Sequence, residues 1–186
     1  MSTRAEHRDE ATKRIARHLL RTGLAQTSLR QLAAAADVSD RMLLYYFSNK
    51  NDVLTSALHR VAAEMAEKLN ASLPAHEKHA PAELLRRGAA LTEARSFKPY
   101  MRISLEIAAS AARGEEPYAG VSSEIIAGFL VWIEARLSAP DAKQRRREAT
   151  MILAVIDGLS VMSSGVKPRE AEGAVASFAA LLERAE

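Results

Sequence analysis

The chain of 186 residues contains no cysteine, and glycine, proline and aromatic residues are scarce. The absence of cysteine excludes disulfide bonds and thiolate metal sites, and it is compatible with a reducing cytoplasm. No segment alternates apolar and polar residues for long, so the chain lacks the pattern of β-strands. No apolar run approaches the roughly 18 residues of a membrane span, and the polar N-terminus is unlike a signal peptide. We therefore expect an all-α protein that is cytoplasmic and makes no contact with a membrane.

Recognisable enzyme signatures are also missing. There is no Glu-x-x-His pair for a di-iron site, no Gly-rich phosphate loop, and no nucleophile motif that combines Ser, His and Asp. His76 and His79 lie in the proline-bounded segment 74–81, but no carboxylate-rich or cysteine context surrounds them. This spacing is more typical of solvated loop histidines than of a metal site. We predict no enzyme, no cofactor and no metal site.

Residues 27–54 carry the most informative local pattern. It predicts two short capped helices joined by a tight turn, followed by the capped N-terminus of a third helix. Ser28 and Gln31 fit the Ser-x-x-Gln capping box, in which each side chain bonds to the other residue's backbone N–H. The helix that they begin is predicted to end near Ala36. Its apolar residues, at helical spacing, are Leu29, Leu32 and Ala33.

The segment after this helix fits a turn and a second helix. Asp37 can adopt the left-handed conformation that a short helix-turn-helix connection requires, and Ser39 is a suitable N-cap. The second helix is predicted to run to about Tyr46. Tyr46 and Phe47 are interpreted as core residues that hold the two helices against their neighbours, and Asn49 is predicted to cap the next helix.

The order of these signals resembles the N-terminal domain of the tetracycline-repressor (TetR) family of bacterial transcription regulators. The family pattern is represented here by Thr27 and Ser28, Leu32 and Ala33, Val38 and Ser39, Tyr45, Tyr46 and Phe47, and the segment 49–54. Three positions depart from it, since Asp37 and Arg41 stand where the family usually has Gly, and Leu44 where it often has Tyr. The resemblance implies a helix-turn-helix DNA-binding domain over residues 1–48 and a helical-bundle domain for effector binding and dimerisation over residues 49–186.

The distribution of charge agrees with DNA binding at the N-terminal end. Residues 1–60 contain ten Lys and Arg against six Asp and Glu, whereas residues 61–186 contain sixteen against seventeen. The net charge of +3 therefore comes from the first third of the chain. A basic end joined to a nearly neutral end is what phosphate binding by one domain predicts.

The predicted DNA contacts follow from the chemistry of a recognition helix, whose N-terminal residues face the base edges. Arg41 is the strongest candidate, because a guanidinium can bond bidentately to guanine. Asp40 either accepts from a cytosine amino group, caps the helix or pairs with Arg41. Leu44 can contact a thymine methyl group or pack. The resemblance implies phosphate contacts by Tyr45 and Lys50. The full predicted set is Ser28, Ser39, Asp40, Arg41, Leu44, Tyr45 and Lys50.

One helix is predicted before this motif, with the apolar stripe Ala11, Ile15 and Leu19, and six further helices after it, so that about nine are expected in all. The breaks are prolines and Gly114, and each helix has at least one apolar stripe. The first of the six starts at Asn49 and breaks at Pro74. The others are predicted over about 81–94, 97–112 and 118–137, then after Pro140 and from Pro168.

The apolar stripes of the middle helices are candidates for a ligand pocket, although such stripes are equally typical of plain core. With few charges among them, they favour a small hydrophobic or amphipathic effector. Tyr100 and Tyr118 can supply polar contacts at an otherwise apolar site. The predicted effector residues are Met65, Leu69, Tyr100, Met101, Leu105, Tyr118, Phe129 and Trp132.

The last two helices are predicted to form a dimer interface, because their stripes are more apolar than one bundle core requires. Small residues among them permit close approach of helices across a twofold axis. The alternative is that both helices only close the body. The predicted interface residues are Met151, Val155, Leu159, Met162, Ala174, Phe178 and Leu181.

These observations favour a homodimeric repressor that binds a palindromic operator in double-stranded DNA and is released by a small-molecule effector. One alternative is a DNA-binding or scaffolding protein without a ligand. A helical-bundle enzyme is the other, and the missing motifs argue against it.

Overall fold

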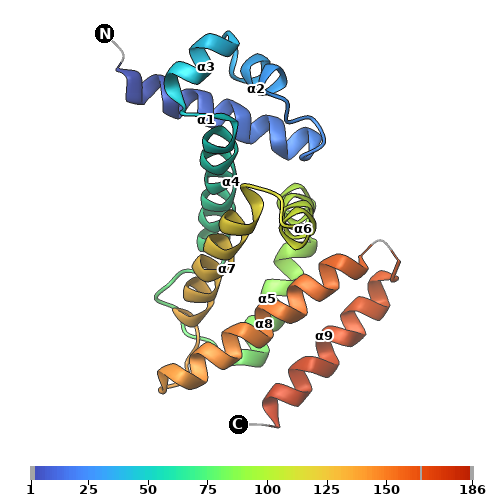
Figure 1. The fold of residues 1–186 in the computed structure, drawn as a ribbon. Coiled ribbons are helices and arrows are strands. Elements are labelled where there is room, and N and C mark those ends of the chain that lie inside the picture. The colour runs from blue at the N-terminus through green and yellow to red at the C-terminus, as the bar shows by residue number, and fades with distance from the viewer. Residues whose placement is uncertain (1–2, 164, 185–186) are drawn as a thin grey trace. The chain divides into compact units, whose positions relative to one another are not determined.

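The computed structural model describes residues 3–163 and 165–184, and regular structure in this part is helical apart from one isolated β-bridge (Figure 1). The prediction of an all-α chain is confirmed. The described helices are α1 (Arg4–Thr22), α2 (Leu29–Ala36), α3 (Asp40–Tyr46), α4 (Lys50–Ser72), α5 (Pro81–Glu93), α6 (Lys98–Ala112), α7 (Tyr118–Glu134), α8 (Ala142–Met162) and α9 (Pro168–Glu183).

The chain forms two compact units, which are described one at a time. Unit 1 comprises the residues up to Ala66 together with Arg102–Ile125, and unit 2 comprises Glu67–Met101 and the residues from Ile126 onward. Helices α4, α6 and α7 each contribute residues to both units. The predicted domain boundary after residue 48 stays a prediction.

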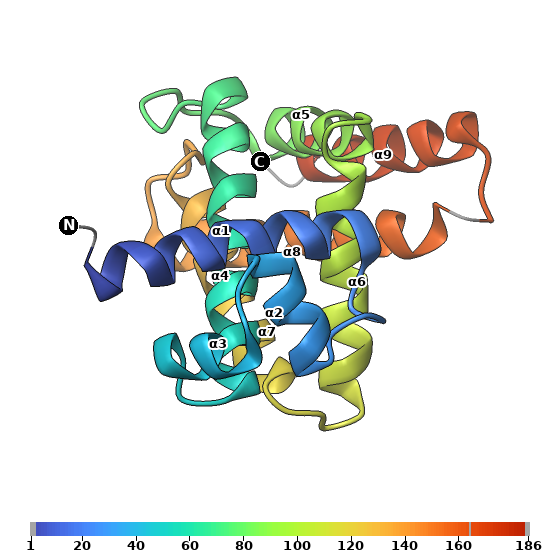
Figure 2. The same cartoon turned by 90° about the horizontal axis from the view of Figure 1, so that it is seen from above.

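In unit 1, α1 is the helix on which α2 and α3 pack (Figure 2). It begins at Thr3, whose hydroxyl accepts the N–H of Glu6 at 3.3 Å while the Glu6 carboxylate accepts the N–H of Thr3 at 2.6 Å. It ends at Gly23, which has a φ of 74°. This backbone conformation favours glycine, and a Cβ there would lie 2.6 Å from a carboxylate oxygen of Glu106, so that the Glu106 side chain would have to shift. The buried face of α1 includes Ala11, Ile15, Ala16 and Leu19.

The predicted capping of α2 and α3 is confirmed. The Ser28 hydroxyl accepts the N–H of Gln31 at 3.3 Å, and the Gln31 side chain accepts the N–H of Ser28 at 3.0 Å. The Ser39 hydroxyl accepts the N–H of Met42 at 3.2 Å and so caps α3. Since the cap is Ser39, the predicted alternative that Asp40 caps this helix is wrong.

Asp37 adopts the left-handed conformation predicted for the turn, with φ of 60° and ψ of 45°. Its backbone N–H donates to the carbonyl of Ala34 at 3.1 Å. Arg14 of α1 holds the turn from outside, because its guanidinium donates to the Asp37 carboxylate at 3.2 Å and to the Ala36 carbonyl at 3.5 Å. Hydrogen bonds with Glu10 and Asp37 raise the pKa of Arg14 above its ordinary value. The side chain that replaces the usual glycine is thus tied to α1.

The start of α4 is fastened to α1. The Asn49 side chain accepts the N–H of Asp52 at 3.0 Å, as predicted for a cap, and the Asp52 carboxylate accepts the N–H of Ser48 at 2.9 Å. Arg8 of α1 donates to Asp52 at 2.7 Å and lies over the buried ring of Phe47, 4.7 Å from its centroid. This node connects α1, the end of α3 and the start of α4.

In unit 2, α5 packs against both α8 and α9 (Figure 1). Each of α8 and α9 buries a narrow face against this core and leaves other apolar residues outside it. The core consists of Leu73, Ala82, Leu84, Leu85, Leu130, Ile133, Leu137, Ala149, Ile152, Ala179 and Leu182.

Arg136 is the largest fully buried side chain and is only 2% exposed. Its guanidinium donates to the carbonyls of Leu73 and Trp132, both at 2.7 Å, and to the side-chain oxygen of Asn70 at 2.6 Å. It also lies 3.7 Å from the centroid of the Trp132 ring. Its charge is buried because three acceptors and an aromatic face replace water around it.

Two predictions about this region are wrong. The helix predicted to reach Leu137 ends at Glu134, because the chain then turns into a backbone bridge in which the N–H of His79 donates to Arg136 at 2.8 Å and the N–H of Ser138 donates to His79 at 3.0 Å. This bridge draws His79 into the protein, so it is buried and not a solvated loop residue. Its Nδ1 lies 3.2 Å from Glu83. No cluster of His, Cys, Asp and Glu suited to a metal ion occurs within the described residues.

Candidate DNA-binding surface and a neighbouring cavity

Helix α3 has one buried face and one exposed face. Leu43 and Tyr46 are buried against the rest of unit 1. The other side chains of α3 are exposed, namely Asp40, Arg41, Met42, Leu44 and Tyr45. Three of these are large and apolar or aromatic, and Tyr45 is 57% exposed. Exposed side chains of this kind are available to base edges, thymine methyl groups and phosphates.

Arg41 and Lys50 carry uncommitted positive charges. Within the described residues, neither side chain has a hydrogen-bond or ion-pair partner, whereas Arg8 and Arg14 are engaged by Asp52 and Asp37. Lys50 is the first residue of α4, where the helix dipole adds to its positive charge. Free cations on exposed helix starts are suited to contacts with phosphates or bases.

Tyr45 has contacts that sequence reasoning did not find, whereas Ser28 is engaged in its predicted capping box. The guanidinium of Arg4 lies over the Tyr45 ring, 4.9 Å from its centroid, and the ring of Tyr46 meets Tyr45 edge-on at 5.7 Å. Arg4 thus places a second positive charge beside a predicted phosphate contact. The Ser28 hydroxyl is used within its own capping box, where it donates to Gln31 at 2.6 Å.

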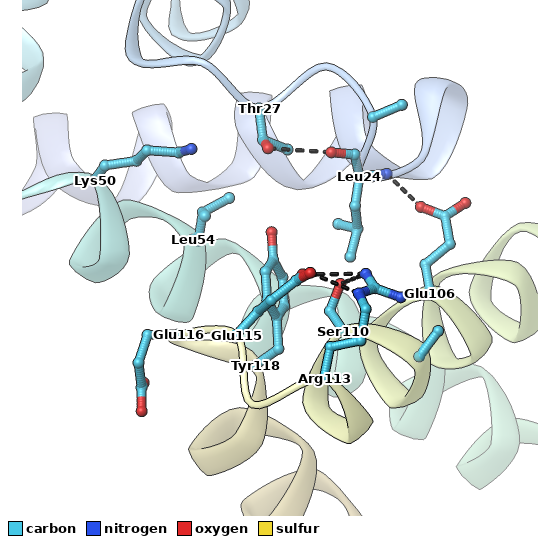
Figure 3. Close-up of a pocket in the computed structure, with 12 residues that line it drawn as sticks. Leu24, Thr27, Lys50, Leu54, Glu106, Ser110, Arg113, Glu115, Glu116 and Tyr118 are labelled. Carbon is cyan, nitrogen blue, oxygen red and sulfur yellow. Dashed lines mark hydrogen bonds and ion pairs between the residues drawn. The ribbon is translucent and has the colours of Figure 1, made fainter.

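A cavity of about 670 Å³ lies in unit 1 beside Lys50 (Figure 3). Its walls come from the segment after α1, the start of α4, the end of α6 and the start of α7. The lining residues are Leu24, Ala25, Thr27, Lys50, Leu54, Glu106, Ala109, Ser110, Arg113, Glu115, Glu116 and Tyr118.

Several polar side chains of the cavity bond to backbone groups or to one another. The Glu106 carboxylate accepts the N–H of Leu24, and Thr27 donates to the Leu24 carbonyl at 3.1 Å (Figure 3). Arg113 donates to the Glu115 carboxylate at 2.6 and 3.1 Å. This hydrogen bonding by Arg113 lowers the pKa of Glu115 below its ordinary value.

The hydroxyl of Tyr118 points into the cavity (Figure 3). Burial raises the pKa of Tyr118 above its ordinary value, and a hydrogen bond with Thr27 opposes that rise. The phenol is therefore neutral at physiological pH and can donate or accept a hydrogen bond.

Of the predicted effector residues, this cavity includes only Tyr118. Leu105, Phe129 and Trp132 are half-buried, and the Trp132 indole donates to Asn70 at 2.8 Å. The four that remain, all buried, are Met65, Leu69, Tyr100 and Met101.

The predicted dimer residues divide into exposed and half-buried groups. Met151, Met162, Phe178 and Leu181 are 45 to 56% exposed in the single chain. The half-buried members are Val155, Leu159 and Ala174.

An exposed second helix of a helix-turn-helix, set in a basic segment, defines a DNA-binding protein of the helix-turn-helix class. Residues 13–57 match the family model of bacterial regulatory proteins, tetR family. The N-terminal part of the chain is therefore similar to the DNA-binding domain of this family of bacterial regulators. The resemblance inferred from the capping and turn residues is confirmed.

Solved structures share the fold over nearly the whole chain. A tetR-family transcriptional regulator from Cytophaga hutchinsonii has 16% identity and a TM-score of 0.76, covering 98% of this chain and 96% of its own. A transcriptional regulator from Rhodococcus sp. Rha1 has 19% identity and a TM-score of 0.72, covering 96% of both chains. The multidrug binding protein EbrR, in complex with proflavin, has 21% identity and a TM-score of 0.70, covering 95% of this chain and 99% of its own.

No curated protein sequence matches the chain. In the part of the chain that the structure describes, no helix is both long enough and apolar enough to cross a membrane.

Proposed function

We propose that the protein is a homodimeric transcriptional repressor that binds a palindromic operator and is released from it by a small hydrophobic or amphipathic effector. The observation that carries this proposal is the exposed face of α3, where Arg41 has no intramolecular partner among the described residues. A free guanidinium at the start of a recognition helix is suited to a guanine edge in the major groove.

The other DNA contacts are assigned by chemistry and exposure. Ser39 and Asp40 lie at the start of α3 with Arg41, where Asp40 accepts from a cytosine amino group, while Leu44 contacts a thymine methyl group. Tyr45, with Arg4 over its ring, binds phosphate. Lys50 binds phosphate as well. Ser28, at the start of α2, is the last of the proposed DNA contacts.

Exposed apolar side chains on α8 and α9 support a dimer. Both helices bury one face on α5 and leave Met151, Met162, Phe178 and Leu181 largely in water. Large exposed apolar side chains on neighbouring helices are typical of a protein interface, and identical chains most often pair about a twofold axis. A twofold dimer presents two recognition helices and therefore requires a palindromic site.

The effector proposal rests on the apolar residues predicted from the sequence and on a structural relative. EbrR, which shares the fold, holds proflavin. Helix α4 carries Lys50 at its start and Met65 and Leu69 toward its end. A ligand that displaces α4 would therefore alter a DNA contact. The ligand weakens DNA binding only to the extent that the ligand itself binds more tightly to the state with low DNA affinity.

A selection of bound duplexes from a random pool tests this function. The purified full chain should enrich a palindrome, and the complex should contain two chains by sedimentation. Selection of a single asymmetric site, or binding without any sequence preference, would contradict the proposal.

A further inference from the structure

The cavity beside Lys50 has no role in the function proposed above. It lies wholly within unit 1, and it shares only Tyr118 with the predicted effector residues. Its volume of about 670 Å³ falls in the range of sites for small molecules, which is about 300 to 1,000 Å³. The chemistry of its walls indicates what kind of molecule it suits.

Apolar surface forms the middle of the cavity. Leu24, Ala25, Leu54 and Ala109 contribute aliphatic groups, and Tyr118 contributes its ring. In Figure 3 the side chains of Leu24 and Leu54 approach the Tyr118 hydroxyl from two sides. Such walls suit the apolar body of a ligand, and the hydroxyl supplies one hydrogen bond.

The carboxylates at the cavity are compensated or directed away. Glu115 is bound by Arg113 through two hydrogen bonds. Glu106 accepts the N–H of Leu24 and lies 3.8 Å from the guanidinium of Arg102. The carboxylate of Glu116 points away from the other labelled residues (Figure 3). None of the three therefore offers a free negative charge to a ligand in the cavity.

Lys50 is the one charged lining residue that has no partner within the described residues and is not directed away from the cavity. It lies on the opposite side of the cavity from Glu106 (Figure 3). Helices α4 and α7 begin at lining residues, Lys50 and Tyr118, and Thr27 directly precedes the cap of α2. Helix starts carry partial positive charge, which adds to that of the ammonium group.

We propose that this cavity binds a small amphipathic acid, whose anionic group pairs with Lys50 and whose apolar body lies against Leu24, Leu54 and Ala109. The bound acid takes Lys50 away from the DNA phosphate. This consequence rests on the proposed DNA contact of Lys50, whereas the ligand site itself does not. Regulation at this site is direct competition for one ammonium group and requires no movement of the predicted effector residues.

Calorimetric titration of the full chain with three probes tests the ligand class. Naphthoate, naphthamide and naphthylmethylamine share one aromatic body and differ in the charge of the head group. Naphthoate should bind about tenfold more tightly than the amide, the difference expected for one charge-assisted hydrogen bond, and the amine should bind most weakly. Equal affinities, tightest binding by the amine, or no binding of naphthoate would overturn the proposal.

Two substitutions test the position of the site. Lys50→Gln should reduce naphthoate affinity about tenfold and leave naphthamide affinity unchanged, since only the charge is removed. Ala109→Trp should fill the cavity and abolish binding of both. Ala108→Trp, on the neighbouring exposed position of α6 outside the cavity, is the matched control and should bind naphthoate normally. Helix content by circular dichroism shows whether each variant is folded. Unchanged naphthoate binding by folded Lys50→Gln and Ala109→Trp variants would place the ligand elsewhere.

Competition with DNA is measured by fluorescence anisotropy on a short duplex of arbitrary sequence at low salt. Naphthoate should weaken DNA binding, and DNA should weaken naphthoate binding by the same factor. Lys50→Gln should weaken both affinities and remove the coupling between them. Coupling that persists in Lys50→Gln would contradict direct competition. Failure of sequence-specific binding by the unmodified chain would instead contradict the proposed repressor function, so the two failures are distinguishable.

Discussion

At the scale of single residues, the same charged side-chain types have different roles according to their partners. Arg8 and Arg14 bind Asp52 and Asp37 and hold helices together. Arg41 and Lys50 have no such partners within the described residues and stay available for DNA. Burial and pairing, and not residue type, therefore separate structural cations from candidate DNA contacts.

Replacement of Arg41 by Ala should weaken binding to the selected palindrome by about 1 to 3 kcal/mol and relax base preference at one position in each half-site. The reason is the loss of a bidentate contact with guanine. Binding-site selection and anisotropy titration measure both effects. Arg30→Ala, an exposed arginine on α2, is the control and should retain the selected sequence. An unchanged selected sequence for Arg41→Ala would show that Arg41 does not contact bases.

Substitutions of Asp37 test the left-handed backbone conformation in the turn between α2 and α3. Its φ of 60° is unfavourable for branched side chains and free of strain for glycine. Asp37→Gly should raise the free energy of unfolding by up to about 1 kcal/mol, because the ion pair with Arg14 is exposed and contributes little. Asp37→Val should lower it by about 1 to 2 kcal/mol. Urea denaturation measures both changes. A valine variant as stable as the original chain would be incompatible with a left-handed residue at this turn.

At the scale of elements, each helix of unit 2 is defined by what covers its faces. Helix α5 is covered by α8 and α9, while the turn after α7 places Arg136 in the core. The outer faces of α8 and α9 have no cover from the described residues and remain apolar. A helix that has one apolar face in the core and a second one exposed is more typical of a subunit in an oligomer than of a monomer, and this applies to α8 and α9.

Arg136→Ala should lower the free energy of unfolding by about 2 to 4 kcal/mol. The substitution leaves the carbonyl of Leu73 without its donor, removes one of the two donors to the side chain of Asn70 and creates a cavity beside Trp132. Arg86→Ala removes an exposed pair with Glu183 and should change stability by less than about 1 kcal/mol. Chemical denaturation compares the two, and similar losses would argue against a structural role for the buried guanidinium.

The double substitution of Phe178 and Leu181 by Glu should convert the proposed dimer into a monomer, because four charges would face each other across the twofold axis. The monomer should also lose affinity for a palindrome. Sedimentation velocity measures the molecular mass, and circular dichroism confirms helix content. Ala176→Glu, exposed on the opposite side of α9, should remain a dimer. A dimer that persists in the double variant would move the interface away from α9.

At the scale of the whole molecule, positive charge is concentrated in the N-terminal third, and the rest of the chain is nearly neutral. DNA binding should therefore be strongly dependent on salt, since each phosphate contact releases counterions. In the proposed function, regulation by an effector couples this end of the chain to a ligand, and such coupling is reciprocal.

The single tryptophan, Trp132, provides the test of that coupling. A compound that changes Trp132 emission and weakens operator binding should itself bind more weakly when operator is present, by the same factor. Titration of Trp132 fluorescence with and without the palindrome measures this factor. Equal ligand affinities in the two titrations would leave a DNA-binding dimer without an effector switch.

The sequence alone determined the local features of the helix-turn-helix. The caps at Ser28 and Ser39, the left-handed residue at Asp37 and the cap at Asn49 depend on neighbours within a few positions, so their chemistry is legible in order along the chain. For the same reason the family pattern over residues 27–54 was recognisable, and it lies within the residues that match the family model. The helix boundaries were also predicted closely, except at the end of α7.

Only the tertiary structure decided which polar groups are buried and where the cavity lies. The hydrogen bond from Arg136 to the carbonyl of Leu73 joins residues 63 positions apart in the sequence. The hydrogen bond from the N–H of Leu24 to Glu106 joins residues 82 positions apart. His79 is buried because a backbone bridge joins it to the segment that follows α7. Such contacts join residues that no local pattern relates, because burial depends on which surfaces the folded chain brings together.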